Sequence, residues 1–524
     1  MGEPRLPEGV LLRSLIVLVL VFSSCETGTA VAGGPRSTPV APPLSLIDQA
    51  LADLSSEDQS KQDAAVQRLS EQGDPSLLLK LEAIRDNADR SVRLAIKPLM
   101  DLLKNRAHLS SADVDQRRSA AADLGSAGKA VAVPWLEAAL ATESHRWVRY
   151  AIEESIALIR LASNDPADKI KAAAKLGELR SQNAVPALKD LVQQGGDSGA
   201  TEQQKSVASA ARAAIEQIDI WASWASAFET IFRGISLSSI LLIMSLGLAI
   251  VFGLMGVINM AHGELMMVGA YATFVTQECF KAYLPQGAFD YYFLASMPVS
   301  FLVAAICGLI LEATVIRFLY GRPLETMLAT WGVSLVLIQA ARVYFGDLTS
   351  VVAPSWLSGG AQVMVGVYLP YNRIFIIGLS ILCVAGIYFL LFRTGVGVRV
   401  RAVTQNRDMS SCLGIPTRKV DAYTFAFGSG LAGLAGCALT LIGNVEPGLG
   451  QNYIVDSFMV VVTGGVGKLM GTIVASLGIG GLNKLLEPSF GAVYGKVLIL
   501  VLVVLFLQRR PSGLFTIKGR HAES

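Results

Sequence analysis

The stretch that decides the fold runs from residue 256 to residue 271 and reads Gly256-Val-Ile-Asn259-Met-Ala-His262-Gly263-Glu264-Leu-Met-Met-Val-Gly269-Ala-Tyr271. Long apolar segments flank it, which places Asn, His and Glu inside membrane sequence. A charged group at the centre of a bilayer costs about 2.5–3.5 kcal/mol on insertion scales, so these side chains are expected to face a protein-lined or aqueous path. The alternative is an interhelical hydrogen-bond clamp that touches no solute.

The charge density of the chain changes abruptly near residue 230. The 524 residues are 52 % hydrophobic and 16 % charged. Residues 231–524 carry 31 charged side chains and a net charge of +7, whereas residues 1–230 carry 55 and a net charge of −5. This division excludes a single soluble globule, a disordered chain and a basic nucleic-acid binder. It predicts an all-α protein in which a soluble module precedes a polytopic α-helical membrane domain.

The N-terminus has the features of a secretory signal peptide over residues 1–32. Arg5 and Arg13 precede an apolar run at residues 14–22, and Ala30-Val-Ala32 provides a cleavage site. The alternatives are an uncleaved anchor and a lipid attached to Cys25. All three place the following residues, beginning with a Pro-rich linker at 33–44, outside the cytoplasm.

A helical repeat is predicted for residues 45–225. The segment 118–125 (RSAAADLG) matches 170–177 (IKAAAKLG), and 133–136 (VPWL) matches 185–188 (VPAL), both at an offset of 52 residues. A weaker copy covers residues 64–103. Three stacked helix pairs would bury together the apolar stripes that one pair leaves exposed. The extracytoplasmic array resembles HEAT-like helical repeats, with a longer period. It either binds a protein or serves as a packing and spacing element.

Residues 230–520 contain about 8–9 apolar runs that are candidate membrane spans. Two late runs are short and flank Gly464-Gly465-Val-Gly467, which predicts a glycine-interrupted hairpin. Irregular backbone inside a bilayer must be covered by protein or line a wet cavity. Glu312 is either a path-lining residue or a helix–helix partner. The predicted solute-pathway residues are Asn259, His262, Glu264, Glu312, Gly464, Gly465 and Gly467.

Basic residues concentrate in the loops on one side of the predicted spans. The loop 393–420 holds six of them, whereas the loops on the other side are nearly bare. The positive-inside rule therefore places this loop and the C-terminus in the cytoplasm. With an odd number of spans the repeats lie outside, as the signal peptide also indicates.

The loop 393–420 is predicted to contain a short amphipathic helix that ends at Gly414-Ile-Pro416. An apolar ridge on such a helix, outside the bilayer, suits the groove of a partner protein. The alternative is a solvated loop that only sets the topology. Its apolar ridge consists of Val403, Met409, Leu413 and Ile415. We name residues 399–415 the coupling segment. Its residues predicted to contact the partner are Arg399, Arg401, Asn406, Arg407, Asp408, Gly414 and Ile415.

At this point a family resemblance becomes specific. The segments GVINMAHGELMMVGAY (256–271) and VRAVTQNRDMSSCLGI (400–415) are similar to the permease subunits of branched-chain amino acid ABC importers. The secreted helical extension makes nearly the whole chain resemble urea-importer permeases of the Urt type. The resemblance implies that residues 399–415 dock on an ATPase. It implies two ABC ATPase subunits, a second related permease and a periplasmic substrate-binding protein as partners, and urea or short amides as substrate. The loop lacks the literal Glu-Ala-Ala start of the family pattern.

No motif for energy supply or catalysis occurs in the chain. Gly467-Lys468 and Gly495-Lys496 lack the surrounding residues of a P-loop, and neither G-x-S-x-G nor H-E-x-x-H is present. The sequence predicts a transport subunit of the inner membrane, in contact with lipid, with no cofactor, no metal and no nucleic-acid partner. Its rivals are a branched-chain amino acid permease, a passive urea or ammonium channel, and a membrane-tethered scaffold.

Overall fold

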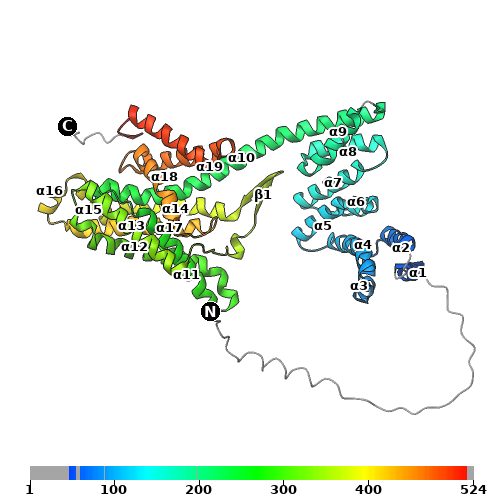
Figure 1. The fold of residues 1–524 in the computed structure, drawn as a ribbon, viewed down its shortest axis with the longest axis horizontal. Coiled ribbons are helices and arrows are strands. Elements are labelled where there is room, and N and C mark those ends of the chain that lie inside the picture. The colour runs from blue at the N-terminus through cyan, green and yellow to red at the C-terminus, as the bar shows by residue number, and fades with distance from the viewer. Residues whose placement is uncertain (1–45, 55–58, 88, 198, 516–524) are drawn as a thin grey trace, which may run out of the picture. The chain divides into compact units, whose positions relative to one another are not determined.

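The computed structural model describes residues 46–515, except 55–58, 88 and 198 (Figure 1). The predicted signal peptide and Pro-rich linker lie outside the described residues. The described chain separates into two compact units, which divide after Ala120.

The first unit is a small helical assembly. It contains α1 (Leu46–Leu54), α2 (Gln59–Gln72), α3 (Leu77–Asn87), α4 (Arg90–His108) and the first part of α5 (Val114–Ser126). Apolar residues of α4 recur every three or four positions at Val92, Ile96, Leu99 and Leu103, so they form one stripe. This stripe packs with leucines of α1, α2 and α3 into a single core.

The second unit begins with helices that carry the sequence repeat. They are the end of α5, α6 (Val133–Thr142), α7 (Arg146–Leu161), α8 (Pro166–Leu179) and α9 (Val185–Gly196). The matched segments fall on α5 and α8, and on α6 and α9. Short 3-10 turns, Ala130–Ala132 and Gln182–Ala184, precede α6 and α9. Each copy therefore holds three helices where the sequence predicts a pair, because a proline in the first turn starts a new helix at α6 and α9.

The third helix of the second copy is α10 (Glu202–Met255), which continues without a break for 54 residues (Figure 1). A capping box between Thr201 and Gln204 starts it. Its first part packs on α8 and α9 through residues such as Ala211 and Ile218. Its last part, including Met244 and Leu248, belongs to the largest core of the second unit. The predicted boundary at residues 225–230 therefore lies within a helix.

The rest of the second unit is a helical bundle with one small β-hairpin. Its helices are α11 (His262–Tyr283), α12 (Tyr292–Thr314), α13 (Pro323–Phe345), α14 (Tyr371–Arg393), α15 (Gly395–Gln405), α16 (Arg407–Cys412), α17 (Thr417–Leu439), α18 (Leu449–Gly464) and α19 (Leu469–Arg509). Short 3-10 helices are Gln286–Tyr291, Ile316–Phe318 and Ser355–Leu357. The strands β1 (Gly360–Met364) and β2 (Val367–Pro370) pair antiparallel.

Six helices of the described chain are long and apolar enough to cross a membrane. They are α10, α12, α13, α14, α17 and α19. Two more predicted runs coincide with α11 and α18. Gly491 has a positive φ of 78° and divides α19 into two helical parts, which correspond to the last two predicted runs. The number of full spans beyond six stays a prediction.

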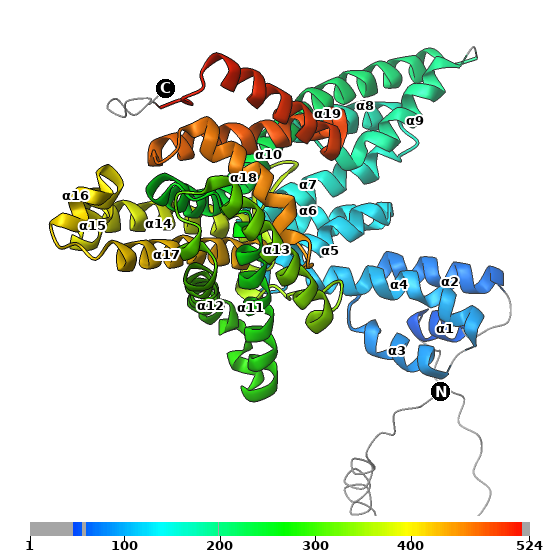
Figure 2. The same ribbon diagram turned by 60° about the vertical axis from the view of Figure 1, so that its left-hand side comes forward.

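The loops of the bundle gather at two ends. At the end named here the hairpin end, Thr349 forms a β-bridge with Val445, and the Asn372 side chain donates a hydrogen bond to the Leu441 carbonyl (2.8 Å). At the opposite end, named the basic end, α15 and α16 stand beyond the ends of α14 and α17 (Figures 1 and 2). The arginine-rich loop lies wholly at the basic end. Which end faces the cytoplasm stays a prediction.

Glycines allow α11 and α17 to cross in backbone contact. A Cβ atom at Gly269 would overlap the backbone of Gly433, and a Cβ atom at Gly436 would overlap the carbonyl oxygen of Met266. This is the packing of small residues that brings membrane helices together.

Candidate functional site

The polar stretch of the sequence lies at a break between two helices. Gly256, in the left-handed conformation (φ 68°), ends α10, and α11 begins only at His262. The His262 ring bonds the carbonyl oxygen of Met244 (3.2 Å), so the chain has turned back alongside α10. Asn259, His262 and Glu264 are each at most 1 % exposed. The break therefore places three polar side chains in the interior of the bundle, whereas their place on a solute path stays a prediction.

Each of these side chains leaves a buried polar atom without a partner among the described residues. The atoms are Asn259 Nδ2, His262 Nδ1 and Glu264 Oε2. Because the Met244 carbonyl can only accept, Nε2 of His262 donates to it, and in a neutral ring Nδ1 is then an acceptor. Buried polar atoms are normally paired, and an unpaired one costs about 1–3 kcal/mol. The cluster therefore offers one donor and two acceptors to a polar ligand.

Helix α13 closes one side of the cluster. The Thr330 hydroxyl accepts a hydrogen bond from the backbone N–H of Met260 (3.1 Å), which fixes the irregular segment. Ser334, one turn further along α13, lies close enough to interact with the Glu264 carboxyl group. Thr330 and Ser334 are both buried.

A second helix begins at the same place. Gly263 of α11 contacts Gly450 at the start of α18 so closely that a Cβ atom on either glycine would collide with the backbone of the other. The Ser245 hydroxyl of α10 reaches the Ser457 carbonyl of α18 (3.4 Å). The N-termini of α11 and α18 therefore meet inside the bundle.

The predicted glycine hairpin has a different environment. Gly464 packs on Gly471, which holds the end of α18 against the start of α19. Gly465 (φ 97°) touches the backbone of Phe515, and Gly467 (φ 79°) lies against Gly253 of α10. The described contacts of these glycines link none of them to Asn259, His262 or Glu264. The turn is present as predicted, at the basic end.

Glu312 also lies at the basic end, where it belongs to a network of charges. Its buried carboxylate pairs with Arg317 (3.8 Å). Buried Asp421 of α17 pairs with Arg407 of α16 (2.5 Å), and the Arg407 guanidinium lies over the Tyr320 ring (5.0 Å). Burial raises the pKa of the Tyr320 phenol, so this ring stays neutral. The network joins α12, the loop before α13, α16 and the start of α17.

The coupling segment consists of two short helices, α15 and α16, and not of the single predicted helix. The Asn406 side chain interrupts the helix by capping α16, since its oxygen accepts a hydrogen bond from the Met409 N–H (2.9 Å). Gly414 (φ 82°) ends α16. Asn406 and Gly414 thus shape the segment.

The side chains of this segment divide into an inner and an outer group. Val403 is buried against Val400 and Val420, and Ile415 packs partly on them. Arg401 lies over the Phe392 ring (5.1 Å). The other members are exposed: Arg399, Arg401, Asn406, Arg407, Asp408, Met409, Leu413 and Gly414. The predicted apolar ridge is therefore split, and its exposed part is Met409 with Leu413.

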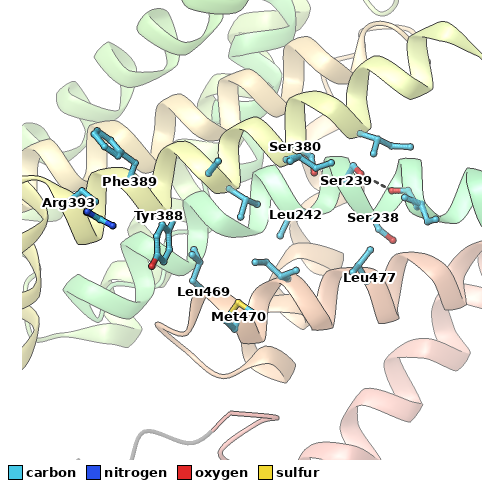
Figure 3. A pocket seen from close by; sticks show the side chains of 16 residues that line it. Ser238, Ser239, Leu242, Ser380, Tyr388, Phe389, Arg393, Leu469, Met470 and Leu477 are labelled. Atoms are coloured by element: carbon cyan, nitrogen blue, oxygen red, sulfur yellow. Dashed lines mark hydrogen bonds between the residues drawn. The ribbon is translucent and has the colours of Figure 1, made fainter.

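A groove of about 880 Å³ opens between α10, α14 and α19 (Figure 3). Its walls are mainly apolar, with Leu242, Phe389 and Leu477 among them. Ser239 donates its hydroxyl hydrogen to the Ile235 carbonyl (2.9 Å). None of the predicted pathway residues lines this groove, so it is separate from the polar cluster.

Sequence reasoning missed several members of the site. Thr330 and Ser334 lie in an apolar run in which isolated Ser and Thr residues are common, so nothing in the sequence marks them. Only the fold brings them to residues 259–264. Gly450 carries a signal that was available: it stands in Gly448-Leu-Gly450, shortly before the apolar run that follows Gln451 and Asn452. Asp421, an acid opening an apolar helix, is a similar signal.

Comparisons with known proteins agree with this architecture. The chain is 28 % identical over 292 residues to the high-affinity branched-chain amino acid transport system permease protein BraD of Pseudomonas aeruginosa, an overlap of 55 % of this chain and 94 % of that protein. It is 25 % identical over 294 residues to the corresponding protein LivH of Escherichia coli, covering 55 % and 94 %. The ribose import permease protein RbsC of Haemophilus influenzae is 30 % identical over 129 residues, 22 % of this chain and 40 % of that protein. No solved structure gives a significant match.

A family model described as branched-chain amino acid transport system, permease component, matches residues 230–507. The matched range is more than half of the chain. It includes the α10–α11 break, the coupling segment and the start of α18. The chain therefore belongs to the family of permease components of branched-chain amino acid transport systems.

Proposed function

We propose that this multi-pass inner-membrane permease carries urea or a short amide past Asn259, His262 and Glu264, using energy supplied by separate ATPase subunits. The observation that carries the proposal is the set of unpaired, buried polar atoms at the α10–α11 break. A permease must offer polar partners at a narrow point of an otherwise apolar route. These three side chains meet that requirement.

The chemistry of the cluster suits a small neutral amide. Urea presents N–H donors and one carbonyl acceptor. The acceptors His262 Nδ1 and Glu264 Oε2 match the donors, and the donor Asn259 Nδ2 matches the carbonyl. Resemblance to urea importers over the N-terminal repeats supports the same substrate.

The partners follow from the same resemblance. One ABC ATPase subunit docks on α15 and α16, where exposed Met409 and Leu413 provide the apolar contact, and the importer holds two such subunits. A second related permease and a periplasmic substrate-binding protein complete the importer. The repeats at residues 45–225, a HEAT-like array in this proposal, lie outside the cytoplasm, and the C-terminus lies inside.

A branched-chain amino acid is the second candidate substrate. The printed names of BraD and LivH favour it. The N-terminus of α11 inside the bundle also favours it, because helix N-termini in transporters receive substrate carboxylates. Glu264 in the first turn of α11 opposes it, since its carboxylate would repel that of an amino acid.

A competition assay separates the two candidates. Cells or vesicles containing the complete importer are given labelled urea with excess unlabelled leucine, and labelled leucine with excess unlabelled urea. We expect ATP-dependent urea uptake that leucine does not reduce. Leucine uptake that urea leaves unchanged, with no urea uptake, would assign the chain to amino acids. Uptake of urea that persists after ATP depletion would identify a channel instead.

Replacing Asp421 by asparagine tests the link between the coupling segment and the bundle. The variant loses the ion pair that holds Arg407 and α16 to α17. We expect ATP hydrolysis by the assembled importer to continue while uptake per ATP falls at least about fivefold, which corresponds to a coupling of about 1 kcal/mol. The control Glu278→Gln removes an exposed pair with Lys281 far from this end and should leave the ratio unchanged. An unchanged ratio in Asp421→Asn would show that the network is not part of the coupling.

A further inference from the structure

Residues 443–458 resemble residues 256–271 at an offset of 187 positions. The later segment reads Gly443-Asn-Val-Glu446-Pro-Gly-Leu-Gly450-Gln451-Asn-Tyr-Ile-Val-Asp-Ser-Phe458. Glycine recurs at 256 and 443 and at 263 and 450, and valine at 268 and 455. The pairs Asn259 with Glu446, Glu264 with Gln451 and Tyr271 with Phe458 are chemically related.

The two segments occupy the same kind of place in the fold. The first follows the long helix α10 and opens α11, whereas the second follows α17 and opens α18. The helix α10 ends at the basic end, where Gly253 meets Gly467. The helix α17 ends at the hairpin end, where Asn372 reaches Leu441. The second segment is therefore an inverted counterpart of the first.

Equivalent positions of the two copies touch each other. Gly263 and Gly450 are 187 positions apart, and a Cβ atom on either would collide with the backbone of the other. The preceding helices α10 and α17 also pack closely, since a Cβ atom at Gly247 would overlap the Gly428 carbonyl oxygen. Contact between equivalent positions is expected where two halves are related by a pseudo-two-fold axis in the membrane plane.

We propose that residues 443–458 form the second half of the solute site, with half-buried Glu446 and exposed Gln451 as specificity-determining residues at the positions equivalent to Asn259 and Glu264. This inference rests on the proposed function of the first half. Glu446 is half-buried, and its carboxylate accepts a hydrogen bond from the Asn452 amide (3.0 Å). It lies within electrostatic reach of Tyr271, a residue of the first copy.

Tyr271 supplies an independent sign of a ligand at this point. The residue is 3 % exposed, and its hydroxyl has no partner among the described residues. Its ring stacks on Phe345 (4.3 Å between centroids), which fixes the direction of the hydroxyl. A fixed, unpaired hydroxyl within electrostatic reach of a carboxylate is suited to a polar solute, since the hydroxyl can donate to its carbonyl oxygen and the carboxylate can accept from its N–H groups.

The inversion also describes how the site alternates. Each copy offers the solute one helix N-terminus, and the two meet at the Gly263–Gly450 contact. When the copies exchange conformations, the contact parts toward one end of the bundle and closes toward the other. The solute then meets Glu446 and Tyr271 at the side of the hairpin end, and Asn259 on its way to the basic end.

Uptake by the complete importer tests the proposal with Glu446→Gln, Glu264→Gln and the control Glu487→Gln. Glu487 lies in α19, paired with Lys484. We expect Glu446→Gln and Glu264→Gln each to lower the uptake of labelled urea, or of leucine, at least about tenfold. The control should match the unmodified importer, and all variants should retain their ATPase subunits on purification. Loss in Glu264→Gln alone overturns the second half while the proposed function stands. Loss in neither variant overturns both.

A labelling experiment tests whether residues 443–458 change their exposure during the transport cycle, and it needs no transported substrate. Gln451→Cys and the control Glu487→Cys are placed in an importer whose exposed Cys279 and Cys412 are replaced by serine. A membrane-impermeant thiol reagent is applied with and without trapping by ATP and vanadate. We expect the labelling rate of Gln451→Cys to change several-fold and that of the control to stay constant. Equal rates in both states for Gln451→Cys, or an equal change in the control, would overturn the inference.

Discussion

Replacing Glu264 by glutamine is expected to reduce solute uptake by the complete importer at least about tenfold, a loss of about 1.4 kcal/mol. The substitution keeps the size of the side chain but exchanges an unpaired carboxylate oxygen for an amide that carries donors. The donors of the solute then meet a donor inside the bundle. The measurement is the initial rate of labelled urea uptake, with leucine uptake alongside, in cells with equal amounts of the variant in the membrane.

The matched control for this experiment is Glu325→Gln. Glu325 lies in the first turn of α13 and makes an exposed pair with Arg322 (3.1 Å), so its replacement removes the same charge away from the cluster. It should transport at the unmodified rate. Normal uptake by Glu264→Gln would remove this carboxylate from the route and leave it the role of a helix–helix partner.

Replacing Gly436 by alanine is expected to destabilise the bundle by about 1–3 kcal/mol, the cost of overpacking an interior. The added methyl group would overlap the carbonyl oxygen of Met266, which is backbone and cannot turn aside. The helices α11 and α17 must then separate, and the start of α11 with its polar cluster moves with them. The measurement is the thermal unfolding midpoint of the purified importer in detergent, together with its uptake rate after reconstitution.

Gly478→Ala is the control for this second variant. Gly478 also lies within a helix, but a Cβ atom there would meet nothing within 4 Å. Alanine gains about 0.5–1 kcal/mol over glycine in a helix, so the midpoint of this variant should stay the same or rise slightly. Equal midpoints for the two variants would show that α11 and α17 do not cross in backbone contact.

The membrane helices were predictable because each is marked by a local run of apolar residues. Recognising such a run requires no knowledge of contacts with distant segments. The polar cluster was predictable for a related reason, since Asn259, His262 and Glu264 are conspicuous in such a run. Their burial and unpaired atoms confirm that they lie inside the bundle, whereas their contact with solute stays a prediction.

What the sequence did not reveal depends on contacts between distant segments. In the sequence, Gly464 and Gly450 carry equally strong signals. Only the fold shows that Gly450 contacts Gly263. Arg407 looks like a solvated basic residue of a docking loop, and it is exposed, but it also pairs with buried Asp421, fourteen positions later. The repeat was recognised from its period, yet its three-helix composition depends on where a proline restarts the helix.

The uninterrupted course of α10 has a consequence for how the chain can be altered. A helix advances about 1.5 Å and turns about 100° with each residue. One residue inserted near position 228 would therefore rotate the first part of α10, with α8 and α9 packed on it, by more than a quarter turn relative to the bundle, unless the helix broke. Deletions of three or four residues come close to restoring the phase, and deletions of one or two do not. Because α10 belongs to both the repeats and the bundle, no flexible linker separates them. Grafting the repeats onto another permease therefore requires that the helical phase at the junction match that of α10, as well as a compatible sequence.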